Sequence, residues 1–399
     1  INPDSYAKQI TIGLSPLAYN LDEVVVRPGI NPAHRIINEA VRNRDTNNPE
    51  KLSQFRYNSY NKMYFTFHRD TISISEKSKG TANDSIPSSF IDSLDKKIDA
   101  FNRRQHIFLM ESVTERNFRS PGNNSEKVLA SRVSGLKDPF FVFIATQFQS
   151  FSFYPELLNL GGKNYLNPIS RGSTSRYLFI LEDTIFTQTY DTLFVISFRP
   201  LRNRNFDALK GVMSINSNGY AIQTVIAEPV EPPSPLFNIK IQQRYELIDS
   251  IQWFPVELNT DILMNLVNAQ AKDTATGQVI PMSILGVGSS YIKNIDLNPQ
   301  NRWREFSHVE LTFDPLSGER DEEFWQQFRG DSLTRQEQRT YHTIDSLGKE
   351  INLDRRLKLI ESLVTGRIPV GYFSLDLNRL LTYNRFEGYR LGIGLETNQ

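Results

Sequence analysis

The chain contains no cysteine among its 399 residues. This absence excludes disulfides, thiolate nucleophiles and zinc sites built on thiolates. The chain also lacks an excess of charge, since 45 Lys and Arg residues balance 45 Asp and Glu residues. A balanced chain creates no global field that would attract polyanions. We therefore predict no nucleic-acid partner.

Long apolar runs are missing as well, because no stretch approaches the roughly 20 residues that a membrane-spanning helix needs. Catalytic motifs are equally scarce. The five histidines have no metal-ligand spacing, and neither a Gly-x-Ser-x-Gly elbow nor a phosphate-binding glycine loop occurs. The stretch GVGSS at 286–290 is typical of a loop by composition. We predict no catalytic, cofactor-binding or metal-binding residues and a protein that is not an enzyme.

Aromatic residues, in contrast, are abundant, with 26 Phe and 16 Tyr. The segment 55–70 is strand-like, and successive segments from 107 to about 313 alternate apolar and polar residues. In FNIKIQ, for example, Phe237, Ile239 and Ile241 point to one side of a strand. These patterns predict a mainly β (α+β) protein, with a curved, antiparallel, half-barrel-like sheet that is apolar on one face and covered by helices.

Local signals mark turns and helix starts. The pair Asn218–Gly219 predicts a β-hairpin. Asn31 and Pro32 suit the N-cap and first position of a helix whose apolar stripe includes Ile36 and Ile37. Thr334 and Glu337 have the spacing of a capping box at the start of another helix, and 353–366 has helical periodicity.

The end of the chain reads as a strand. Within RFEGYRLGIGLE, one face carries apolar residues and the other face carries polar residues or glycine; the apolar positions are Tyr389, Leu391, Ile393 and Leu395. A transmembrane β-strand has this alternation over roughly 9–11 residues. The alternative is an edge strand of an ordinary sheet. Because the first residues alternate too, we expect the sequence to be a fragment of a larger protein.

The segment LDEVVVRPGINPAHRIINEAVRNRDTNNPEKLSQFRYNSYNK resembles a junction in a large outer-membrane family of Bacteroidetes, and FWQQFRGDSLTRQEQRTYHTIDSL and YNRFEGYRLGIGL resemble two further motifs of it. Members of that family join a carboxypeptidase-regulatory-like β-sandwich to a domain of unknown function and a C-terminal transmembrane β-barrel. The resemblance implies that Tyr389, Leu391, Ile393 and Leu395 face the membrane. It implies no catalytic residues.

Together, the patterns and the resemblance predict five regions. These are the tail of the sandwich (1–27), a helical connector (28–54), an antiparallel periplasmic domain (55–316), a helical segment and linker (317–384) and the first strand of an outer-membrane barrel (385–399).

Two stretches are candidates for contacting a partner or lipid. DPFFVFIATQFQSFSFYPELL is unusually aromatic, and its candidates are Phe140, Phe141, Phe143, Phe148 and Phe151. The alternative for these residues is ordinary core. FRPLRNRNFDALK gathers cations between two strands, with Arg199, Arg202 and Arg204 as candidates for holding a lipid phosphate or an acidic loop. The alternative is a solvated strand connection.

These observations favour the periplasm-facing region of an outer-membrane protein. We expect a non-enzymatic accessory or scaffold subunit in outer-membrane protein assembly or envelope biogenesis, with other outer-membrane proteins as partners. The second hypothesis is a lipid or lipoprotein carrier, which needs a cavity of several hundred cubic ångströms on the apolar face. The third is a hydrolase, which needs carboxylates with mutually perturbed pKa values in a cleft.

Overall fold

The computed structural model divides the chain into two compact units, Ile1–Asn31 and Pro32–Gln399. It describes residues 31–68, 88–135, 151–187, 190–202, 205–234, 237–272, 279–299, 306, 311–330, 332–351 and short strands between 367 and 397. The predicted sandwich tail at 1–27 and the predicted helix at 353–366 lie outside the described residues.

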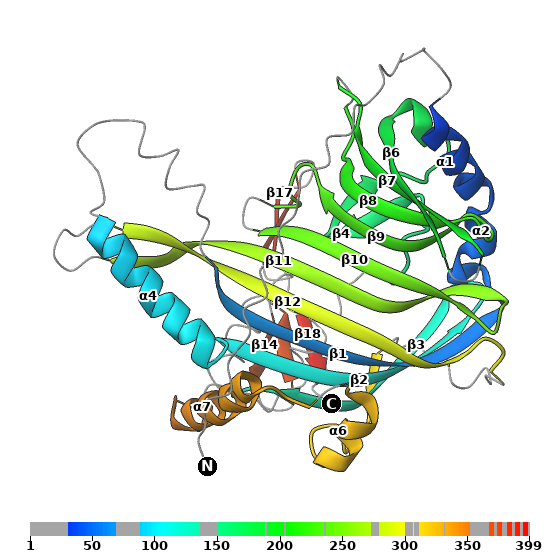
Figure 1. Cartoon of the computed structure of the whole chain (residues 1–399). Helices are drawn as coiled ribbons and strands as arrows, with labels where there is room; N and C mark the ends of the chain where they lie inside the picture. Colours follow the sequence, from blue (N-terminus) through cyan, green and yellow to red (C-terminus); the bar gives the residue numbers. More distant parts are fainter. Residues whose placement is uncertain are drawn as a thin grey trace, which may run out of the picture. The chain divides into compact units, whose positions relative to one another are not determined.

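One large sheet of eleven strands organises the second unit, in the order β13-β3-β2-β1-β12-β11-β10-β9-β8-β7-β6 (Figure 1). All neighbouring strands are antiparallel except β13 and β3. The sheet is curved and does not close, which confirms the predicted fold class. The strands are β1 (Gln54–His68), β2 (Phe108–Arg119), β3 (Asn123–Val133), β6 (Tyr177–Phe186), β7 (Thr192–Pro200), β8 (Leu209–Asn216), β9 (Ala221–Pro229), β10 (Phe237–Ile248), β11 (Gln252–Lys272), β12 (Val279–Asp296) and β13 (Leu311–Phe313).

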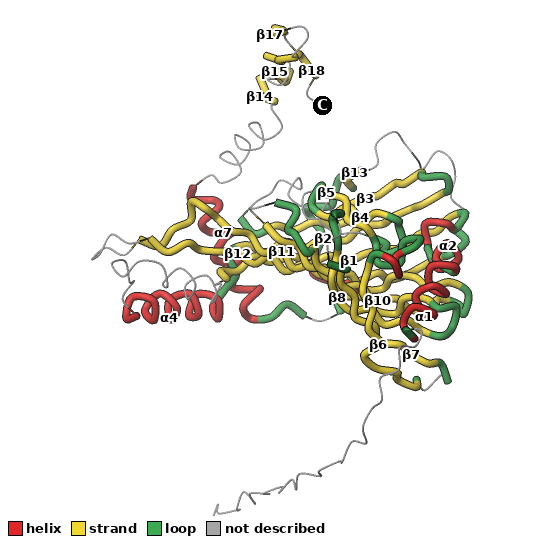
Figure 2. Tube along the Cα trace, turned by 90° about the horizontal axis from the view of Figure 1, so that it is seen from above, coloured by secondary structure: helices red, strands yellow, loops and turns green. Residues whose placement is uncertain are grey.

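Helices and small strand pairs surround this sheet. Figure 2 shows α1 and α2 at one end of it and α4 and α7 at the other. The helices are α1 (Pro32–Arg42), α2 (Arg44–Asn47), α4 (Ser88–Arg104), α6 (Glu322–Phe328) and α7 (Arg335–Ile351), with 3₁₀ turns η1 (Pro49–Lys51) and η2 (Ser173–Ser175). A short hairpin joins β4 (Leu157–Leu160) to β5 (Lys163–Leu166).

The alternation in β10 divides the sheet into two faces. Ile239 and Ile241 are buried on what we call the core face, whereas Lys240 and Gln242 are exposed on the outer face. This confirms the arrangement predicted from FNIKIQ. The turn at Asn218–Gly219 joins β8 to β9, as predicted, and Gly219 adopts φ +70°, where glycine meets no steric penalty.

The largest core lies on the core face of β6 to β10. Helix α1 and the segment that begins at Phe153 pack against these strands. Every one of the following side chains is at most 2% exposed: Ala33, Ile36, Ile37, Ala40, Phe153, Tyr154, Leu158, Leu160, Tyr165 and Ile169. The helix predicted from Asn31–Pro32 is therefore part of this core and not only a connector.

A smaller cluster lies on the outer face of β1 to β3. There, Tyr60, Val113 and Ala130 pack against Trp325 of α6. Figure 1 shows α6 and α7 beside these strands. The two groups of helices thus cover opposite faces of one sheet, at its two ends.

One prediction for this region is wrong. GVGSS at 286–290 forms part of β12 and is not a loop. A Cβ on Gly286 would lie 2.8 Å from the ring of Phe65, the residue that pairs with it on β1. The glycine is needed because this ring occupies the space beside the strand, and composition alone does not reveal that neighbour.

The last strands are short. β14 (Arg367–Val370), β15 (Phe373–Asp376) and β18 (Gly394–Thr397) form one small sheet, and β16 (Leu381–Asn384) pairs with β17 (Gly388–Leu391) in another. The single strand predicted near the end is therefore described as two strands, β17 and β18, in separate sheets. The sequence has Gly392 and Gly394 at this point, and glycine weakens a strand.

Candidate functional site

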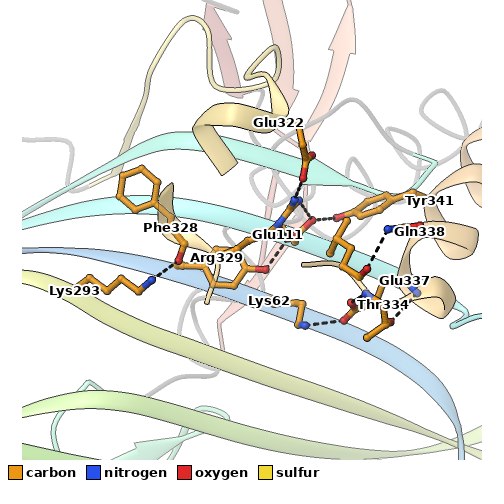
Figure 3. A network of polar contacts seen from close by, with 12 residues as sticks. Lys62, Glu111, Lys293, Glu322, Phe328, Arg329, Thr334, Glu337, Gln338 and Tyr341 are labelled. Atoms are coloured by element: carbon orange, nitrogen blue, oxygen red, sulfur yellow. Dashed lines mark hydrogen bonds and ion pairs between the residues drawn. The ribbon is translucent and has the colours of Figure 1, made fainter. Parts of the chain in front are cut away.

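A group of titratable side chains lies close together between the outer face and helices α6 and α7 (Figure 3). Its centre is Glu111 on β2, whose side chain is completely buried. Arg329 donates two hydrogen bonds to this carboxylate, from Nε to Oε1 at 2.6 Å and from Nη2 to Oε2 at 2.8 Å. The hydroxyls of Tyr60 and Tyr341 donate to Oε1 at 2.6 Å and to Oε2 at 2.8 Å. We call these four residues the Glu111 cluster.

The Glu111 cluster is chemically saturated. An ionised carboxylate offers about four acceptor sites, and the two bonds from Arg329 and one from each tyrosine use them. Burial raises the pKa of Tyr60 and of Tyr341, and the nearby Glu111 charge raises both pKa values further. Burial alone would lower the pKa of Arg329, but its hydrogen bonds and ion pair with Glu111 outweigh that effect and raise it. Tyr60, Tyr341 and Arg329 therefore keep their protons, and the Glu111 cluster joins the sheet to α6 and α7.

Two further contacts beside the Glu111 cluster also join the sheet to these helices. Lys62 on β1 pairs with Glu337 on α7 at 2.7 Å, and Glu337 also accepts from the Thr334 backbone N–H at 2.8 Å. The Glu337 N–H returns to the Thr334 hydroxyl at 3.2 Å, which confirms the predicted capping box. Lys293 on β12 donates to the backbone oxygen of Phe328 at 2.8 Å, at the end of α6 (Figure 3).

A buried histidine, His106, lies beside α7. Its backbone N–H donates to the Thr340 hydroxyl at 2.8 Å, and its ring stacks on the ring of Tyr64 with centroids 4.1 Å apart. The ring atom Nδ1 is buried without a hydrogen-bond partner. Burial lowers the pKa of His106, so the neutral ring is favoured in the folded protein.

Sequence reasoning did not identify the Glu111 cluster, although signals for it existed. Glu111 stands between Leu109 and Val113 on the same strand face, and a carboxylate among buried apolar positions needs a partner. Glu337 and Tyr341 are four residues apart and lie on one face of α7. The sequence did not indicate that Arg329 would be the partner, because 218 residues separate it from Glu111.

Of the five aromatic candidates, the structure describes Phe151. Phe140, Phe141, Phe143 and Phe148 lie outside the described residues. Phe151 is half-buried, stacks on Tyr57 with centroids 5.5 Å apart and lies under the Arg116 guanidinium at 4.4 Å. For Phe151 the structure therefore supports the core alternative over a partner-facing role.

The cationic candidates lie at a strand connection. Arg199 is exposed near the end of β7 and Arg202 is exposed just after it, whereas Arg204 lies outside the described residues. Lys210 at the start of β8 pairs with Glu228 at 3.0 Å. The structure thus places the two described arginines in solvent and brings neither into the Glu111 cluster.

The membrane-facing candidates are described only by their backbone. Tyr389 and Leu391 belong to β17 and Leu395 belongs to β18, whereas Ile393 lies outside the described residues.

An open pocket of about 390 Å³ lies beside β10, β11 and β12, lined by Arg244, Tyr291 and Lys293 among others. Its cations are already engaged, since Arg244 pairs with Glu246 and with Glu257, the latter at 3.1 Å, and Lys293 holds the end of α6. Across the described ranges, no three His, Asp or Glu side chains come together as a metal ion would require. Among the described helices, none is both long and apolar enough to span a bilayer.

Comparison with known proteins finds one family. The model of a family of unknown function, DUF5686, matches residues 36–279, which is more than half of the chain. No curated protein matches. A solved structure of a DUF1329 family protein from Desulfovibrio piger ATCC 29098 is similar at 10% identity and a TM-score of 0.28, over 70% of this chain and 98% of that one. The chain therefore belongs to the DUF5686 family of unknown function.

Proposed function

We propose that this chain is the periplasm-facing part of an outer-membrane β-barrel protein and serves as a non-enzymatic accessory or scaffold subunit. Its machine would be one for outer-membrane protein assembly or envelope biogenesis, with other outer-membrane proteins as partners. The motifs that resemble the Bacteroidetes family support a sandwich tail at 1–27 and a barrel strand at 385–399.

One observation carries the scaffold role: the sheet has an uncovered apolar surface. On the outer face of β6 to β9, Ile180 is 44% exposed, Val212 39% and Ile226 38%. Val212 and Ile226 are direct cross-strand neighbours, whereas the polar Ser197 lies between Val212 and Ile180. We call Ile180, Val212 and Ile226 the outer patch. Exposed apolar side chains gathered on one sheet face in this way are typical of a protein-binding site.

The carrier alternative has less support. It needs a cavity beside the apolar residues of FNIKIQ and GYAIQTVI, yet Ile239, Ile241 and Val225 lie in a core filled by α1 and the segment from Phe153. These side chains are at most 2% exposed. A bound acyl chain would have to displace that packing.

The hydrolase alternative also has less support. The most deeply buried carboxylate in the described residues, Glu111, has all its acceptor sites occupied by Arg329, Tyr60 and Tyr341. A general base must be within hydrogen-bond reach of a substrate proton. The Glu111 carboxylate is completely buried and therefore has no acceptor site that a substrate could reach.

The test is a gentle-detergent pull-down of the full-length protein from its own outer membranes, with mass spectrometry of what is retained. We expect stoichiometric recovery of other outer-membrane proteins, and loss of at least one of them from the variant Val212→Lys/Ile226→Lys. The matched control is Lys240→Ala, which changes an exposed residue of the same face outside the outer patch. Recovery of the protein alone with bound lipid would favour a carrier and contradict the scaffold.

A further inference from the structure

The strand β6 ends the large sheet, and its two halves differ sharply. Tyr177 and Phe179 in the first half are buried in the main core, whereas every residue from Glu182 to Phe186 is exposed. In the part of the chain that the structure describes, β7 is the one strand that pairs with β6 (Figure 1). An exposed sheet edge is a template for an added strand.

The backbone groups of this edge can be assigned from the ladder. The Thr187 backbone N–H donates to the Asp191 backbone oxygen at 2.9 Å. Antiparallel ladder bonds recur at every second residue, so the backbone N–H and C=O of Ile185 also point toward β7. The backbone N–H and C=O groups of Thr184 and Phe186 therefore point away from β7. An independent contact agrees: the Thr184 N–H donates to the Asp183 carboxylate at 2.7 Å and not to the ladder.

The charge of this edge selects among possible occupants. Glu182 and Asp183 are adjacent, exposed and at the middle of the stretch from Ile180 to Phe186. A second copy of β6 paired antiparallel over that stretch would place Asp183 opposite itself, and like charges directly opposite destabilise a strand pair. A strand with a basic residue at its centre would instead find a complementary charge.

The hairpin tip next to this edge has an unusual aromatic residue. Tyr190 is 99% exposed and adopts φ +64°, and Phe186 is 80% exposed. Positive φ favours glycine or asparagine, and a bulky residue there is strained. Strain of this kind occurs at binding sites, where the side chain serves a purpose other than stability.

We propose that the outer edge of β6 binds an extended segment of a partner protein, added as a further antiparallel strand with a basic residue opposite Glu182 and Asp183. Alternate apolar side chains of that segment would lie beside Ile180 and Ile185 on the outer face, and Tyr190 would cover its end. The inference deepens the proposed scaffold role and rests on it only for the biological source of the partner.

The test uses the full chain and two synthetic strand peptides of alternating Thr and Val, as long as β6, with either two Lys or two Glu at the centre. Labelled peptides are titrated and followed by fluorescence anisotropy. We expect the Lys peptide to bind about tenfold or more tightly than the Glu peptide, and the variant Glu182→Lys/Asp183→Lys to reverse that preference.

A pair of variants tests the edge itself. In the complex, a carbonyl of the added strand would replace the Asp183 carboxylate as the acceptor for the outward Thr184 N–H. Thr184→Pro removes that N–H without removing a ladder bond, and proline is tolerated at such edge positions. It should abolish binding of the Lys peptide, whereas the matched control Thr184→Val keeps the N–H and should retain binding. Tyr190→Gly should weaken binding while leaving the fold intact.

Absence of binding by both peptides at about millimolar concentration would overturn the proposal. Equal binding by Thr184→Pro and the unaltered chain would overturn it as well. If the chain dimerised in a concentration-dependent way and Thr184→Pro abolished the dimer, the occupant of the β6 edge would be a second copy of this chain. That result would overturn the proposed partner segment. None of these outcomes affects the pull-down result, so failure of this inference is distinguishable from failure of the scaffold role.

Discussion

At the scale of single residues, the Glu111 cluster accounts for how two helices are held on a sheet. A buried ion pair contributes little net stability compared with apolar residues of equal volume, but removal of one partner leaves an uncompensated buried charge. Glu111 and Arg329 therefore specify where α6 and α7 attach, and each is costly to change alone.

Glu111→Ala or Arg329→Ala should lower the free energy of unfolding by about 3–5 kcal/mol. Replacing both residues together by methionine should cost much less, because no unpaired charge remains. Urea unfolding of the single and double variants measures the difference. The matched control is Glu322→Ala, since Glu322 contacts Arg329 but is 56% exposed, and it should cost about 1 kcal/mol or less. If the double variant lost as much free energy of unfolding as the two single variants together, the proposed role of the Glu111–Arg329 pair would be contradicted.

His106 should make stability depend on pH. Burial lowers the pKa of its ring in the folded protein, so the unfolded chain binds the proton more readily. The free energy of unfolding should therefore fall as pH decreases through the unfolded value near 6.5 toward the lower folded value. Glu337 and Lys62 face His106 with opposite effects, and the lowered pKa of Glu337 contributes stability that is lost only in a more acidic range.

The measurement is chemical denaturation between pH 7.5 and pH 5.5, compared with His106→Phe, which keeps an aromatic ring against Tyr64. The pH dependence in this range should decrease in the variant. An unchanged dependence would show that other groups cause it.

At the scale of elements, most strands follow from alternation, and the helices at Pro32 and Arg335 follow from their start signals. GVGSS shows where this reasoning fails. Gly286 lies within β12 because the ring of Phe65 occupies the position of its missing side chain. That neighbour is 221 positions earlier in the sequence (286 − 65 = 221), so no local pattern could reveal it.

Gly286→Ala should therefore destabilise the protein by about 1–3 kcal/mol through overpacking. Gly318→Ala is the matched control, because a Cβ there has no neighbour within 4 Å, and its effect should be about 0.5 kcal/mol or less. Thermal unfolding measures both. In the background of Phe65→Leu, the cost of Gly286→Ala should decrease, and an unchanged cost would exclude the ring contact as its cause.

At the scale of the whole molecule, the second unit depends on a helix that the sequence suggested was a connector. Helix α1 places Ala33, Ile36, Ile37 and Ala40 in the main core. The boundary between the two compact units falls between Asn31 and Pro32, so α1 belongs to the second unit.

A chain shortened to begin at Asn31 should thus keep cooperative unfolding of the sheet unit, whereas a chain shortened to begin at Arg44 should lose it. Burial of each large aliphatic side chain contributes roughly 1.5–3 kcal/mol, so loss of α1 removes a large part of a typical domain's stability. Differential scanning calorimetry distinguishes the two. Equal unfolding transitions in both shortened chains would show that α1 is dispensable.

Local sequence patterns were enough to predict the alternating strands, the apolar and polar faces of β10, the Asn218–Gly219 turn and the capping box at Thr334. These features arise from backbone geometry and from contact with water, which act over a few neighbouring residues. The folded structure was needed to show that Arg329 pairs with Glu111, that the Phe65 ring requires a glycine at 286 and that α1 packs on the core face. Those contacts join residues hundreds of positions apart, and their existence depends on which elements the folded chain brings together.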